Sequence, residues 1–159
     1  MCDVEKLNTE KLLVKLKSDD EIFNKLQEQY NKIIEEQEVL FKKYLNKLMP
    51  CIEFIHSKRY RFIHPSIKYV SSKGPILGYN SKNNFLYVYD IKTKYPRKIN
   101  MYNTDEMDFV SYKEIFELEG FENALQGLLY VPQIYEKLIK EIKQEIEINK
   151  ELLNKYNID

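Results

Sequence analysis

Two segments near the ends of the chain carry apolar residues at steps of three and four, which is the spacing of an amphipathic helix. We expect the first helix over residues 18–49 and the second over residues 133–157. A long isolated helix is marginal in water, so each apolar stripe needs a surface that covers it. One helix enters the middle of the chain and the other leaves it. The pattern therefore predicts an antiparallel, coiled-coil-like pair.

The ends of the first helix carry recognisable signals. Ser18, with Glu21 three residues later, has the form of a capping box. Pro50 cannot donate the next helical hydrogen bond and is expected to end the helix. Gln37 and Asn149 fall on the two apolar seams, where a polar residue either fixes the register or is tolerated near a wet edge. The stripes are broader than one partner helix covers, which predicts a homodimer.

Between the helices, residues 54–103 show short runs of Tyr, Val, Ile and Phe separated by turn residues, a pattern typical of strands. Phe85–Tyr89 is apolar at every position, which indicates an internal strand covered on both faces. Short connections favour an antiparallel meander over parallel crossovers. The expected strands are Arg59–His64, Ile67–Ser71, Ile76–Asn80, Asn84–Ile91 and Lys98–Tyr102, with a turn from Lys92 to Arg97.

Two short helices are expected over residues 111–130. Ser111 with Glu114 forms a second capping box, and Gly120 separates this helix from the next. The predicted fold class is therefore α+β: two long helices bracket a small β-meander in a single domain, residues 1–159. This layout resembles that of prefoldin subunits in topology alone. The helices within residues 111–130 depart from that likeness, and no motif assigns a family.

Charge is distributed unevenly along a chain whose formal net charge is zero. Residues 54–103 carry ten Lys and Arg against the single acid Asp90, whereas residues 104–159 carry a net charge of −7. Seven of the 13 Tyr lie in the basic block. Lys and Arg neutralise phosphates and aromatic rings stack on bases, so the block predicts a surface for single-stranded nucleic acid, a nucleotide or a nucleoprotein.

In a meander, alternate turns share an end, which brings Lys73 close to the turn after residue 91. The candidate ligand-binding residues are Arg59, Arg61, Lys73, Lys92, Lys94, Tyr95, Arg97 and Lys98. Two alternatives stay open. Tyr is favoured in strands and Lys blunts sheet edges, so the block could be structural. A protein partner with an acidic surface could also bind it.

Familiar catalytic motifs are absent: no glycine-rich phosphate loop, HExxH, GxSxG or CxxC pair occurs. Cys51, His56 and His64 have a spacing that zinc could use, with Cys2 or an acid as fourth ligand. Asp105, Glu106 and Asp108 could hold magnesium, although acids before a helix usually serve its dipole. We expect neither metal nor cofactor, and a non-catalytic protein.

No run approaches the roughly 20 apolar residues that span a bilayer, and the N-terminus lacks a secretion signal. With only two Cys, the sequence predicts a cytoplasmic location. Abundant Lys, Ile and Asn beside one Ala suggest an AT-rich genome, as in accessory proteins of mobile elements. Three functions follow as hypotheses: a polyanion-binding module, a protein-interaction module that acts through the helices as an inhibitor or chaperone-like adaptor, and an enzyme without a known motif.

Overall fold

The structure of the chain is a computed structural model that describes residues 4–158. Its internal contacts separate two units, Met1–Val39 and Leu40–Asp159. The first unit contains a short 3-10 helix, η1 (Val4–Lys6), and the N-terminal part of helix α1 (Thr9–Ser57). In that part every residue from Thr9 to Tyr30 is exposed, so no apolar core supports it.

Helix α1 begins nine residues before the predicted Ser18, so the first predicted capping box is wrong. Asn8 occupies the capping position, and its Oδ1 accepts a hydrogen bond from the backbone N–H of Lys11 at 3.1 Å. Asn satisfies an N–H at a helix start that would otherwise lack a partner. Strong helix formers such as Glu10, Lys11 and Leu12 then allow the helix to start there.

Pro50 does not end α1, which continues to Ser57. Proline inside a helix costs about 3 kcal/mol, because it removes a hydrogen bond and crowds the preceding turn. Buried side chains of α1 lie on both sides of it: Phe41 and Leu45 before it, and Ile52 and Ile55 after it. Burial of such a side chain contributes about 1.5–3 kcal/mol, so the apolar face offsets the proline.

The middle of the chain forms two antiparallel sheets rather than one meander of five strands. A hairpin pairs β1 with β2, and a four-stranded sheet has the order β3-β4-β5-β6. The strands are β1 (Phe62–His64), β2 (Ile67–Ser71), β3 (Ile76–Asn80), β4 (Phe85–Asp90), β5 (Tyr95–Asn100) and β6 (Met107–Phe109). The prediction of β4 as an internal, buried strand is confirmed. Strand β6 was not predicted.

The two faces of the four-stranded sheet carry different sets of buried side chains. On one face, Ile76, Leu86, Val88 and Ile99 form an apolar cluster. The β1–β2 hairpin packs on this cluster, where the rings of Tyr69 and Tyr79 approach to 4.8 Å. The opposite face carries Tyr87 and Tyr89, because strand residues alternate between faces.

Two short helices follow the sheet as predicted: α2 (Tyr112–Glu119) and α3 (Phe121–Leu129). The predicted cap of α2 is confirmed, since Ser111 Oγ accepts a hydrogen bond from Glu114 N at 3.1 Å. Helix α2 packs against α1, where the ring of Phe41 lies 5.1 Å from the ring of Tyr112. The six strands, α2, α3 and residues 40–57 of α1 are called the head below.

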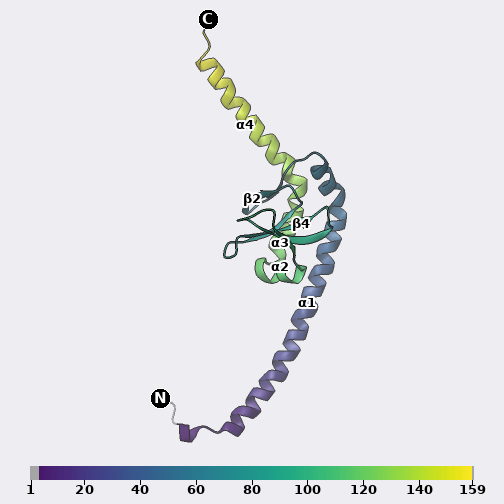
Figure 1. Cartoon of the computed structure of the whole chain (residues 1–159), viewed down its shortest axis with the longest axis vertical. Coiled ribbons are helices and arrows are strands. Elements are labelled where there is room, and N and C mark those ends of the chain that lie inside the picture. Colours follow the sequence, from purple (N-terminus) through teal and green to yellow (C-terminus); the bar gives the residue numbers. More distant parts are fainter. Residues whose placement is uncertain (1–3, 159) are drawn as a thin grey trace. The chain divides into compact units, whose positions relative to one another are not determined.

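The prediction of an antiparallel helix pair around the β-segment is wrong. After the 3-10 helix η2 (Val131–Gln133), helix α4 (Ile134–Lys155) starts against the head and leads away from it (Figure 1). Ile134 is the buried residue of α4, and every residue from Ile139 to Ile158 is exposed. Helix α1 contacts α4 through the aromatic rings of Phe54 and Tyr135, whose ring centroids are 6.0 Å apart.

The physical reason is that the C-terminal part of α1 packs within the head, whereas α4 is exposed beyond its first turn. The C-terminal part of α1 packs Phe41 against Tyr112 and Phe116 of α2, whereas α4 meets α1 at its own first turn, where Tyr135 contacts Phe54. The topological likeness to prefoldin depended on a returning helix pair and fails with it. Within residues 4–158, none of the helices has the length and apolar character needed to cross a membrane.

Candidate functional site

Two turns meet at one end of the four-stranded sheet. The β2–β3 connection contains Lys73, and the β4–β5 turn contains Lys92 and Lys94. The backbone N–H of Ile91 donates to the carbonyl oxygen of Lys73 at 3.1 Å, which holds the turns together. All three lysines are exposed. This group of cations, called the turn-end lysines, is the part of the predicted basic rim that lies in turns.

Asp90 organises this end of the sheet from within. Its side chain is buried, and its carboxylate accepts hydrogen bonds from Lys92 N at 3.2 Å and Thr93 Oγ1 at 2.9 Å. Arg97 Nη1 lies 3.6 Å from the same carboxylate, and Arg97 Nη2 donates to the carbonyl oxygen of Met107 at 2.8 Å. Arg97 thus joins β4, β5 and β6 instead of standing free in a turn.

Tyr95 lies at the start of strand β5, so the predicted turn from Lys92 to Arg97 is three residues too long. Its ring makes an edge-to-face contact with Phe109 of β6 at 6.0 Å. Both rings are largely exposed, at 59% for Tyr95 and 65% for Phe109. Phe109 was missed because β6 has three residues. The alternation of Met107 and Phe109 after a polar turn was the available signal.

The remaining predicted site residues lie elsewhere. Lys98 is on the opposite face from Tyr95 and Arg97, because successive strand residues alternate. Its Nζ lies 5.0 Å from the ring centroid of Phe85, and Asp108 is its partner in β6. Arg59 and Arg61 are exposed in the connection between α1 and β1, so the strand predicted over Arg59–His64 begins three residues too early. The structure therefore divides the predicted rim into three places.

The residues considered as possible metal ligands are not brought together. Between residues 4 and 158 the structure places no three His, Cys, Asp or Glu side chains so that they could share an ion. Cys51 and His56 are exposed on α1, and Cys2 lies outside the described residues. Glu106 instead accepts a hydrogen bond from Asn100 Nδ2 at 2.9 Å, which closes the β5–β6 connection.

His64 is a structural residue of the head. Its Nε2 lies 2.8 Å from the carbonyl oxygen of Asn123 in α3, and its Nδ1 accepts a hydrogen bond from Ser66 N at 3.1 Å. These partners assign the proton to Nε2. Burial lowers the pKa of His64, and the bond to the Asn123 carbonyl opposes this only in part. His64 is therefore neutral and joins β1 to α3.

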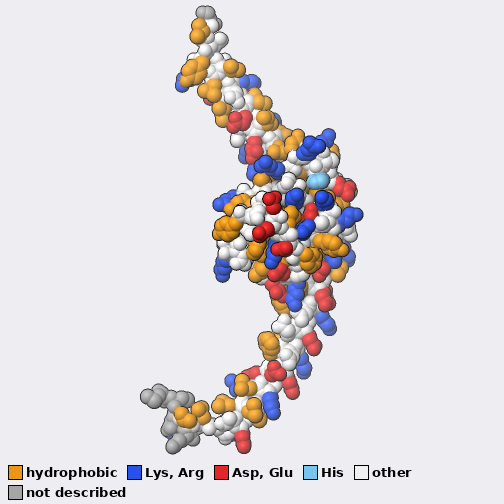
Figure 2. All heavy atoms as spheres, viewed as in Figure 1, with side chains coloured by type: hydrophobic (Ala, Val, Ile, Leu, Met, Phe, Trp, Pro, Cys, Tyr) orange, Lys and Arg blue, Asp and Glu red, His pale blue; other side chains and the backbone are white. Residues whose placement is uncertain are grey.

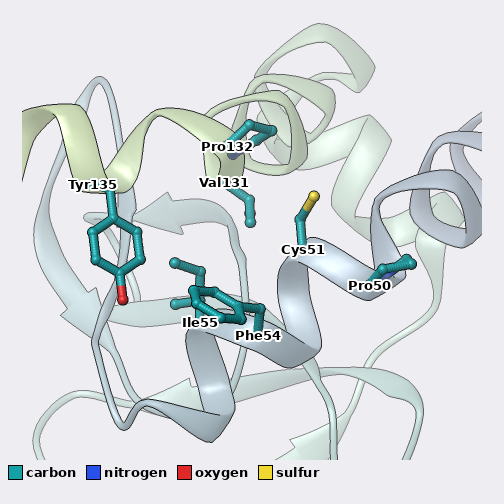
Figure 3. A pocket seen from close by; sticks show the side chains of 7 residues that line it. All are labelled: Pro50, Cys51, Phe54, Ile55, Val131, Pro132 and Tyr135. Carbon is teal, nitrogen blue, oxygen red and sulfur yellow. The ribbon is translucent and has the colours of Figure 1, made fainter.

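An apolar hollow of about 350 Å³ lies where α1 and α4 meet. Figure 3 shows Tyr135 pointing from α4 toward Phe54 and Ile55 of α1. The ring of Tyr135 also packs edge-on against Tyr60 at 5.2 Å. The lining residues are Pro50, Cys51, Phe54, Ile55, Val131, Pro132 and Tyr135. These contacts occupy the apolar face of α4 at its first turn.

Beyond that turn, α4 presents an uncovered row of apolar side chains, visible along the helix in Figure 2. The row, called the α4 stripe, is between 46% and 73% exposed and consists of Ile139, Ile142, Ile146, Leu153 and Tyr156. Asn149 completes its alternating steps of three and four, and its Nδ2 donates to the carbonyl oxygen of Glu145 at 2.8 Å.

The first unit carries a similar row on α1. This row, called the α1 stripe, is between 42% and 63% exposed and consists of Leu12, Leu16, Phe23, Leu26, Tyr30 and Ile33.

Comparisons with protein-family models, curated proteins and solved structures find no match to this chain.

Proposed function

We propose that this chain is a non-catalytic protein-interaction module that assembles as a homodimer through the apolar stripes of its long helices. The observation that carries the proposal is the exposure of these stripes. Ile142, in the middle of the α4 stripe, is 57% exposed, and Phe23, in the α1 stripe, is 60% exposed. A helix without tertiary support needs a partner surface to remain folded.

The total surface supports the same conclusion. The chain exposes 12085 Å². Monomeric proteins of its mass expose about 8,400 Å², by the scaling of surface with mass. Contiguous exposed apolar surface of this kind marks interaction sites, because it gains free energy when a partner removes it from water. A repeat of apolar residues at alternating steps of three and four is the pattern by which helices pair.

The first test is the molar mass of the protein in solution. Light scattering at tens of micromolar should give a dimer for the wild type. A variant carrying both Phe23→Asp and Ile142→Asp should give a monomer, since each change places a charge in a stripe. The head should stay folded in this variant, which near-ultraviolet circular dichroism of its tyrosines would report. A monomeric wild type at that concentration would overturn the proposal.

A second candidate function is binding of a polyanion, single-stranded nucleic acid above all, at the turn-end lysines. It is favoured by the exposed ring of Tyr95, directly after the β4–β5 turn, and by its contact with the exposed ring of Phe109 in β6. Aromatic rings beside lysines can stack on bases while the cations neutralise phosphates. Asp90 is buried and bonded to Arg97, so it subtracts little from this exposed positive charge.

Salt titration of fluorescence anisotropy with single-stranded DNA and RNA tests the second candidate. Replacing Lys92 and Lys94 by Gln should flatten the salt dependence by about 0.7 per lost phosphate contact. Tyr95→Ala should weaken binding by about 1–3 kcal/mol with little change in the salt slope. Lys82→Gln, in the β3–β4 turn at the other end of the sheet, is the matched control. Absence of binding at low salt would eliminate this function.

A further inference from the structure

The contacts of Tyr135 within its own chain determine where the uncovered α4 stripe begins. At the first turn of α4, Tyr135 occupies the same seam as Ile139 and Ile142, one step of four earlier. That position is already covered, because Tyr135 contacts Phe54 and Tyr60 of its own chain. The uncovered part of the seam therefore runs from Ile139 to Tyr156, where it is exposed throughout.

The covered first turn decides the direction of an incoming helix. A second α4 that ran parallel would bring its own Phe54 and Tyr60 to the same end of the seam. Paired helix axes lie about 8–10 Å apart, which leaves no room there for the residues of two heads. An antiparallel second α4 places the two heads at opposite ends and leaves the seam free along its length.

The charges of α4 are compatible with a second copy of the same helix. Residues 134–155 carry five Lys and five Glu, so two copies approach without net repulsion. Residues 134–144 have three Lys and two Glu, and residues 145–155 have two Lys and three Glu. Antiparallel pairing sets the positive half of one helix against the negative half of the other. It also opposes the two helix dipoles.

We propose that a second copy of this chain binds along the α4 stripe as an antiparallel helix, in a two-fold symmetric contact. Full overlap of the uncovered seam places Ile139 opposite Tyr156 of the second copy and Ile142 opposite Leu153. A two-fold axis then passes between Ile146 and Asn149, so one surface serves both copies. This inference deepens the proposed homodimer and rests on it, since it names the helix and the direction that build the interface.

Distances between spin labels on full-length protein test the inference. The background is Cys2→Ser with Cys51→Ser, and one label is attached at Lys155→Cys. In the antiparallel pair, residue 155 lies opposite residue 140 of the second copy, so the labels are about 22 Å apart along the axis at 1.5 Å per residue. In a parallel pair they would lie side by side. A label at Glu147→Cys, near the two-fold axis, is the control that should be close in either direction.

The outcomes separate this inference from the proposed function when molar mass is measured on the same samples. A dimer with close labels at residue 147 and separated labels at residue 155 supports the antiparallel α4 pair. A dimer with close labels at both positions overturns the direction. A dimer with distant labels at residue 147 overturns α4 as the interface, while the homodimer itself stands. A monomer overturns both.

Discussion

The head and helix α4 use apolar residues in opposite ways. In the head, Ile52, Ile76 and Ile115 are fully buried. In α4, isoleucines recur at the regular spacing of a helix face, yet the side chains of Ile142 and Ile146 are exposed to solvent. The same residue type thus closes a core in one region and leaves a surface in the other. Regular spacing indicates a helix face, whereas burial depends on what the fold brings to that face.

The largest expected difference between the two regions is the loss of stability when an isoleucine in each is replaced by a charged residue. Ile52→Asp should destabilise the head by about 3–5 kcal/mol, because it leaves a buried charge without a partner. Ile148→Asp makes the same change on α4, at a half-exposed position outside the α4 stripe, and should alter stability by less than about 0.5 kcal/mol. Urea unfolding of both variants measures this. Equal destabilisation would remove the distinction between the two regions.

A smaller effect is expected where α3 touches the sheet. A Cβ added to Gly127 would lie 1.8 Å from the carbonyl oxygen of Ile76 and 3.2 Å from His64 Cδ2. Gly127→Ala should therefore cost about 1–3 kcal/mol or more, since helix and strand must separate. Gln126→Ala, at the adjacent exposed position, should be close to neutral. Thermal unfolding of the pair checks this, and a wild-type melting temperature for Gly127→Ala would show that α3 and β3 are further apart.

The smallest expected effect is a dependence of head stability on pH. The pKa of His64 in the folded head lies below its ordinary value of 6.5, because burial disfavours the charged ring. The stability that the neutral ring contributes is complete above pH 6.5. It is lost as the pH falls through the interval between 6.5 and the lowered pKa, because the unfolded chain takes up the proton first.

His64→Gln should remove this added slope of the free energy of unfolding, whatever its effect on stability at neutral pH. Urea titrations at several pH values between 7 and 5 give the comparison. The same slope in wild type and His64→Gln would assign the pH dependence to other groups.

Several local features could be predicted because they depend on neighbouring residues alone. The cap formed by Ser111 with Glu114, the buried strand Phe85–Asp90 and the helical character of residues 134–155 belong to this group. The turns after Ser71 and Asp90 meet because consecutive antiparallel strands return to the same end. Other local predictions failed: Asn8 replaces Ser18 as the start of α1, and Tyr95 begins a strand.

Within the candidate site, the exposed lysines at positions 73, 92 and 94 were predictable as turn residues. The role of Arg97 was not, because it depends on Asp90 in β4 and on the carbonyl oxygen of Met107 in β6. Phe109 was missed for the same reason: a strand of three residues carries almost no pattern of its own. It becomes a strand because Arg97 and Ile99 of β5 pair with it.

The sequence by itself determined the spacing that makes α1 and α4 amphipathic, the concentration of positive charge between them and the absence of familiar catalytic motifs. Tertiary structure alone decided which apolar faces are covered. Helix α1 continues through Pro50 because Ile52 and Ile55 are buried beyond it, and α4 stays uncovered because the chain buries only its first turn against the head. The periodicity of a sequence predicts an apolar helix face, but only packing between residues distant in the sequence determines which element covers that face.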